Sequence, residues 1–212
     1  TCDVRGRLVP CGCFTGQLGG LTRIGTMMGS QPDALKLDAG DALAGNADFE
    51  RIQLAYIHRA FGKLGYDAVN LGHREAGLSA DQLRGVARES AVPLLSANLL
   101  DAASGQPVAK PFVVVKKGGW RIAIAGVMDS HLPPEQLGAG LRLERPENAL
   151  SRLLPALKAQ ADFRVLLAFS NEAALHSLAR EFPEFDLVLG GKVTQPAQKL
   201  EREGNAGILY VT

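Results

Sequence analysis

The sequence has 212 residues, 46% hydrophobic and 21% charged, which is enough to bury the core of one domain or at most two. Its 23 basic and 22 acidic side chains almost cancel, and no basic stripe could follow a phosphate backbone, so a nucleic-acid partner is not expected. No apolar run approaches the roughly 20 residues that a membrane-spanning helix needs, so no membrane span is expected in this segment.

Short apolar, β-branched runs alternate with amphipathic stretches, as in folds whose sheets are covered by helices. In chain order we expect a helix over 21–28, a strand over 35–38, a helix over 49–64, a strand over 68–71, a helix over 80–89, strands over 93–97, 112–116 and 121–126, a helix over 147–159, a strand over 164–168, a helix over 172–181, and strands over 187–189 and 208–211. Ser79, followed by Gln82, predicts a capping box. Gly118 and Gly119 predict a tight hairpin, and therefore mixed sheets.

No linker, repeat or low-complexity segment divides the chain, so we expect residues 1–212 to form a single domain. Thr1 begins at a motif loop that should follow a first strand, while Val211 and Thr212 end inside another strand pattern. Because a buried strand normally needs its neighbours, we expect the domain to be a fragment of a longer chain.

Four segments carry the functional information, and each follows a predicted strand. They are the segments 1–6 (TCDVRG), 37–41 (LDAGD), 70–75 (NLGHRE) and 189–194 (LGGKVT). Open α/β folds build their sites at the carboxyl ends of strands, where turn amides and helix amino termini converge. We therefore expect the four segments to cluster in space.

In order and spacing, these segments resemble the calcineurin-like metallophosphoesterases, specifically the amino-terminal domain of the 5′-nucleotidase branch. The likeness spans nearly the whole chain, and the phrases at 64–69 (LGYDAV) and 96–99 (SANL) also resemble that branch. The resemblance implies a four-layer αββα sandwich with mixed sheets. It also implies a family pattern that holds two metal ions: Asp-x-His, Gly-Asp, Gly-Asn-His-Glu, a later His, and Gly-His-x-His.

This sequence keeps only part of that pattern. Asp3 and Asp41 stand at the positions of the first acid and the metal-bridging acid. However, Arg5 replaces the first His, and His73 replaces the Asn ligand. Arg74 replaces the His that the family uses to assist the leaving group.

The later ligand positions have changed too. The ligand after strand 164–168 is Phe169 or Ser170, and the last two His positions hold Lys192 and Thr194. Two-metal hydrolysis needs cations about 3.5–4 Å apart to clamp the attacking and leaving oxygens. Protonated Arg and Lys cannot ligate a metal, and they repel a dication. The sequence therefore predicts a catalytically degenerate domain without a two-metal centre.

Three cations take the place of the metals, namely Arg5, Arg74 and Lys192. In one hypothesis they form a salt-bridge network that leaves a rigid scaffold. The carboxylates available for this network are Asp3, Asp41 and Glu75. In the other hypothesis surplus positive charge, with an open Arg fork, binds an anion such as phosphate, sulfate or a carboxylate.

All three cysteines fall within the first thirteen residues, at Cys2, Cys11 and Cys13. The Pro-Cys-Gly-Cys phrase, with Gly-Gly-Leu-x-Arg downstream, marks a subgroup of the resemblance. Three interpretations stay open: one soft-metal site for zinc or copper(I), a thiol redox site, or a local disulfide of Cys2 with Cys11 or Cys13. The candidate metal ligands are Asp3, Asp41, His73, Cys11 and Cys13.

We therefore expect a non-hydrolytic binding or structural module. The alternative is an enzyme of changed chemistry, either a one-metal hydrolase or a thiol or metal-thiolate site at Cys11 and Cys13; any catalytic role would fall on Asp41, His73 and Arg74. Partners would be a small anion or a larger extracytoplasmic assembly, since the resemblance implies a periplasmic or secreted setting. His131 is expected to stay outside the site.

Overall fold

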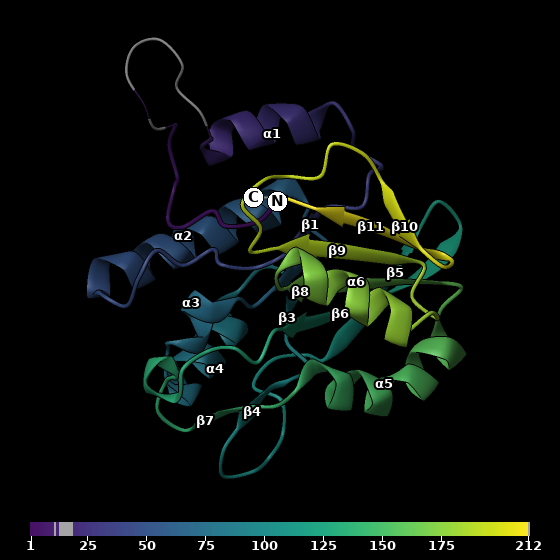
Figure 1. The fold of residues 1–212 in the computed structure, drawn as a ribbon. Coiled ribbons are helices and arrows are strands. Elements are labelled where there is room, and N and C mark those ends of the chain that lie inside the picture. The colour runs from purple at the N-terminus through teal and green to yellow at the C-terminus, as the bar shows by residue number, and fades with distance from the viewer. Residues whose placement is uncertain (11, 13–18, 212) are drawn as a thin grey trace.

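The computed structural model describes residues 1–10, 12 and 19–211 (Figure 1). Its helices are α1 (Leu21–Gly29), α2 (Asp48–Leu64), α3 (His73–Ala76), α4 (Ala80–Glu89), α5 (Pro146–Gln160) and α6 (Glu172–Glu181), with a 3₁₀ turn η1 (Pro134–Gln136). Its strands are β1 (Leu37–Asp38), β2 (Ala68–Asn70), β3 (Leu94–Leu95), β4 (Leu99–Asp101), β5 (Phe112–Lys117), β6 (Trp120–Met128), β7 (Leu141–Leu143), β8 (Phe163–Phe169), β9 (Leu187–Gly191), β10 (Glu201–Glu203) and β11 (Ala206–Tyr210). None of the described helices is long and apolar enough to cross a bilayer.

The strands form two main sheets. A parallel sheet has the order β1-β2-β3, and a mixed sheet has the order β10-β11-β9-β8-β6-β5; β4 and β7 form a separate antiparallel pair. Within the larger sheet β6, β8, β9 and β11 are parallel, while β5 and β10 are antiparallel edge strands. The parallel strands of each sheet bring their carboxyl ends to one edge, which is where the motif segments begin.

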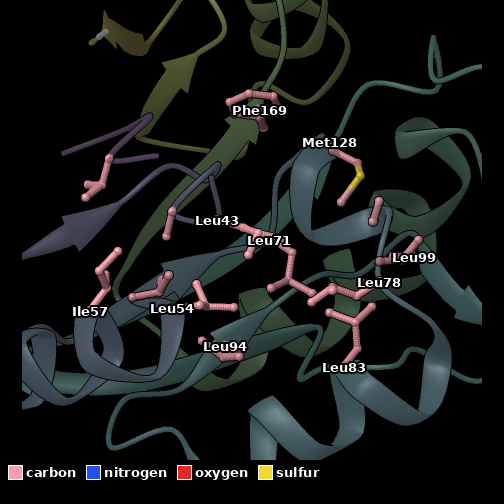
Figure 2. Close-up of a cluster of buried hydrophobic side chains, with 14 of the residues drawn as sticks. Leu43, Leu54, Ile57, Leu71, Leu78, Leu83, Leu94, Leu99, Met128 and Phe169 are labelled. Atoms are coloured by element: carbon pink, nitrogen blue, oxygen red, sulfur yellow. The ribbon is translucent and has the colours of Figure 1, made fainter. Parts of the chain in front are cut away.

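Apolar side chains join these sheets and helices in layers. The two sheets pack face to face through one buried cluster, which contains Leu37, Ala68, Leu95, Ile124, Val165 and Leu167. A second cluster joins the small sheet to α1, α2 and α4, and part of it is drawn in Figure 2. A third joins the large sheet to α5 and α6. This arrangement confirms the predicted αββα sandwich with mixed sheets.

Local signals in the sequence are confirmed at two points. Ser79 Oγ accepts a hydrogen bond from the Gln82 amide at 3.3 Å, and the Gln82 side chain accepts one from the Ser79 amide at 2.8 Å, which is a complete capping box. Gly118 and Gly119 both have positive φ and turn β5 into β6, as a two-residue hairpin requires. The predictions missed β4, β7, β10 and α3, which have only three or four residues each.

Candidate functional site

The first loop of the chain is held against the loop after β1. Four backbone hydrogen bonds join them: the amides of Asp3, Arg5 and Gly6 donate to the carbonyl oxygens of Gly40 (2.8 Å), Asp41 (3.1 Å) and Ala42 (2.9 Å), and the Ala39 amide donates to that of Thr1 (2.8 Å). The buried Asn70 amide, at the end of β2, donates to the carbonyl oxygens of Ala39 (3.1 Å) and Val127 (2.8 Å), and so ties the small sheet to β6 of the large one. The segments expected to cluster are thereby brought to one edge of the two sheets.

The backbone of these loops is strained. Among the described residues, four that are not glycine have positive φ: Asp3 (59°), Arg5 (45°), Asp41 (59°) and Lys192 (60°). Left-handed φ costs an L-residue free energy and persists only where the surroundings impose it. All four lie in the motif segments, so the strained loop geometry is concentrated at the candidate site.

Glycine at position 72 permits the closest approach between two of these loops. A Cβ placed on Gly72 would lie 2.2 Å from Asp41 Oδ1 and 2.6 Å from the Asp41 amide nitrogen. Gly72 thereby lets the Arg74 amide donate to Asp41 Oδ1 at 2.9 Å. Asp41 is thus held by two backbone amides: that of Arg74 binds its side chain, and that of Arg5 binds its carbonyl oxygen.

Glu75 is a buried carboxyl that binds backbone amides. Its two oxygens accept hydrogen bonds from the amides of Leu43 (2.6 Å), Gly72 (2.8 Å) and Asp41 (3.2 Å). Burial, together with the neighbouring Asp41 charge, raises the pKa of Glu75 to about 8 against the opposing effect of its amide donors. The sequence hypothesis that a cation neutralises Glu75 is wrong, because its partners here are amides that clamp the loop after β1 to α3.

Two of the three predicted cations pair with the two predicted acids. The Nε atom of Arg5 contacts Asp3 Oδ1, and the Nε atom of Arg74 lies 3.5 Å from Asp41 Oδ2. The Arg74 guanidinium also donates to the carbonyl oxygen of Ala44. Burial raises the pKa of Asp41 above its usual value, and this effect outweighs the amide and guanidinium of Arg74, which lower the pKa.

The third cation pairs with an acid that sequence reasoning missed. Lys192 Nζ donates to Asp129 Oδ2 at 2.8 Å, and His73 Nε2 lies 3.3 Å from Asp129 Oδ1. The His131 amide donates to the same carboxyl at 2.9 Å, and its exposed ring lies 3.6 Å away, so the expectation that His131 stays outside the site is wrong. Burial would raise the pKa of Asp129, but these donors outweigh burial and hold the pKa well below its usual range.

An aromatic ring fills part of the site. Phe169, at the end of β8, is only 3% exposed, and its ring meets the His73 ring edge-on with centroids 5.3 Å apart. A Cβ on Gly40 would lie 3.1 Å from the Phe169 ring, so this side chain reaches the loop after β1. An apolar ring therefore stands at a position where the family resemblance implies a metal ligand.

Of the three cysteines, the structure describes only Cys2. Cys2 is a free, buried thiol whose Sγ lies 3.5 Å from the Gly40 carbonyl oxygen, which differs from the disulfide considered from the sequence. Burial and the charges of Asp38 and Asp3 raise its pKa strongly, so it is not an activated thiolate. Cys11 and Cys13 lie outside the described residues.

The residues present do not fit a two-metal centre. Within the described part of the chain, no group of three or more His, Cys, Asp or Glu side chains is arranged to hold a metal ion. The acids that could ligate a metal instead bind cationic side chains, in the pairs Arg5–Asp3, Arg74–Asp41 and Lys192–Asp129. What the site can offer chemically is paired charge and hydrogen-bond donors.

Comparison with known proteins identifies the fold. A 5′-nucleotidase of Vibrio cholerae is 26% identical over 180 residues, which cover 76% of this chain and 32% of that protein. The sulfate thiohydrolase SoxB of Thermus thermophilus superposes with a TM-score of 0.79 at 22% identity, covering 92% of this chain and 38% of that one. The calcineurin-like phosphoesterase YfkN of Bacillus subtilis gives 0.77 at 19%, covering 99% and 79%.

No family model matches the chain. The chain nevertheless has the metallophosphoesterase fold found in the amino-terminal domain of 5′-nucleotidases, as the motif resemblance implied. The matched part spans about a third of the length of the curated relative.

Proposed function

We propose that this chain is a catalytically degenerate, non-hydrolytic module of metallophosphoesterase fold that binds a small anion such as phosphate, sulfate or a carboxylate. One observation carries the proposal: Arg5, Arg74 and Lys192 each contact a carboxylate at the edge where the fold's metal ions would lie. Because these cations satisfy the carboxylates and would repel a dication, they replace the metals electrostatically and remove the clamp that two-metal hydrolysis needs.

Exposure of the same cations supports anion binding. The side chains of Arg5, Arg74 and Lys192 are 45%, 37% and 35% exposed, whereas that of Asp129 is 4% exposed. The acids thus lie deeper than their partners and leave cationic surface toward solvent. Arg5 uses Nε for Asp3, so its two Nη nitrogens can bind an anion in bidentate fashion, whereas Arg74 also donates from Nη1 to the Ala44 carbonyl oxygen.

Phosphate titration tests this function. We expect saturable heat of phosphate binding in isothermal titration calorimetry, weakened roughly tenfold or more by Arg5→Gln because a charge-assisted hydrogen bond is lost. Arg121→Gln is the matched control, since Arg121 lies near the start of β6, away from the site, is 49% exposed and pairs with Asp162. Equal loss in both variants, or no saturable binding by the wild type, would reject the anion site.

The rival function is an enzyme of changed chemistry. A one-metal hydrolase would need Asp3, Asp41 and His73 to turn toward a common ion, and each has another partner here. A thiol or metal-thiolate reaction at Cys11 and Cys13 concerns residues outside those described. We further propose a periplasmic or secreted setting, which rests on the likeness to 5′-nucleotidases.

A further inference from the structure

The outward face of α2 carries a row of large apolar side chains. Phe49, Ile52 and Tyr56 are 62%, 59% and 53% exposed. Their spacing of three and four residues places them on one side of the helix. Figure 1 shows α2 along the outside of the molecule, with α1 above it and α4 below. A contiguous exposed row of this kind indicates an interaction surface.

Charged residues extend the same face in a definite order. Asp48 lies at the amino end, where it pairs with Arg51 of the same helix, and Arg59 and Lys63 lie toward the carboxyl end; all three are exposed. The Arg59 guanidinium carbon sits 5.3 Å from the centroid of the Tyr56 ring, so its charge borders the apolar row directly. We call these six residues the α2 outer face: Asp48, Phe49, Ile52, Tyr56, Arg59 and Lys63.

The α2 outer faces of two copies are complementary in charge and in apolar surface when the two helices run antiparallel. We propose that two copies of this chain associate through it as a symmetric dimer with antiparallel α2 helices. A two-fold axis passing between Ile52 and Tyr56 would pack Ile52 of each copy against Tyr56 of the other. The same axis brings Asp48 of one copy beside Arg59 of the other, and the two helix dipoles oppose each other favourably.

Grooves on both sides of the row provide room for the second copy. One lies between α2 and α4 and is lined in part by Ile52, Ala55 and Val86. The other is lined in part by Leu8, Tyr56 and Ala60. The outer face is therefore a ridge between two partly apolar grooves, and in the antiparallel arrangement the Phe49 ring of each copy can enter a groove of the other. Helices commonly pack in this way, with a ridge of side chains on one helix in the groove beside a ridge of the other.

Sedimentation equilibrium of the purified chain tests the dimer. We expect a mass that rises with concentration toward two chains, and a single-chain mass for Ile52→Glu. Trp120→Glu is the control, because Trp120 is 57% exposed on β6, outside the outer face, and this variant should still dimerise. A wild-type chain that stays monomeric at every concentration overturns the proposal and leaves the surface to a different partner or to another part of a longer chain.

Charge reversal checks the antiparallel register. Arg59→Asp should shift the mass toward one chain, because it places acids opposite each other in both symmetric contacts. The double variant Asp48→Arg with Arg59→Asp should recover the dimer, since the exchange restores opposite charges across the axis. Failure of the double variant to recover, with circular dichroism showing it folded, contradicts this register and therefore the proposed dimer.

Discussion

Asp129→Ala should lower the free energy of unfolding by about 3 kcal/mol, because it removes the shared acceptor of a buried network. Lys192, His73 and the His131 amide would all lose a partner. The measurement is urea unfolding monitored by circular dichroism. Asp162→Ala is the control: the pair of Asp162 with Arg121 is solvent-exposed, so its loss should cost much less than the loss of the Asp129 network. Equal losses in the two variants would mean that the Asp129 network is structurally unimportant.

The same network predicts a pH dependence of stability. The pKa of Asp129 is depressed in the folded state, so its contribution is present above its unfolded pKa, near about 4, and is lost as the pH falls through the folded value. The difference in unfolding free energy between the wild type and Asp129→Ala should therefore shrink below about pH 4. A difference that grows on acidification contradicts the assigned ion pairs.

Gly72→Ala should destabilise the protein by about 3 kcal/mol, at the upper end of what overpacking usually costs. The new methyl group would lie 2.6 Å from the Asp41 backbone nitrogen, which cannot move without displacing the strained loop after β1. The measurement is the urea unfolding midpoint, with the loss of free energy obtained from linear extrapolation.

Gly85→Ala is the matched control for Gly72→Ala. Gly85 lies inside α4, where an added Cβ would meet nothing within 4 Å. Replacing a helical glycine with alanine should stabilise the protein by roughly 0.5–1 kcal/mol. The two substitutions should therefore act in opposite directions. A neutral Gly72→Ala would show that the approach of Gly72 to Asp41 is not a constraint.

The fold was predictable because its long elements carry clear periodic patterns. The expected helices over 80–89 and 172–181 have the observed bounds of α4 and α6. By contrast, β4, β7 and β10 have three residues each, too few to show a period, and they depend on contacts distant in the sequence. α3 (His73–Ala76) has only four residues, too few to show a helical period, and its start is fixed by the hydrogen bond that the preceding Gly72 amide donates to the Glu75 side chain.

The site was only partly predictable. Family spacing identified Asp3, Asp41, Arg5, Arg74 and Lys192, and in the structure the first four form two ion pairs. Glu75 was assigned the wrong partners because every residue type except proline carries a backbone amide, so the residue types do not reveal which amides bind a carboxylate. Asp129 was missed because its role needs three-dimensional proximity to Lys192, 63 residues away. Its position directly after β6, at the same sheet edge as the other loops, was the available signal.

Manganese binding tests most directly whether cationic side chains have replaced the metal pair. Mn²⁺ suits oxygen ligands and is poorly held by thiolates, so Cys11 and Cys13 should not obscure the result. Electron paramagnetic resonance during a Mn²⁺ titration, with phosphomonoester hydrolysis followed on the same samples, should show no bound Mn²⁺ pair and no turnover above the protein-free rate. Two bound Mn²⁺ ions per chain, with turnover that Asp41→Ala abolishes, would contradict the account.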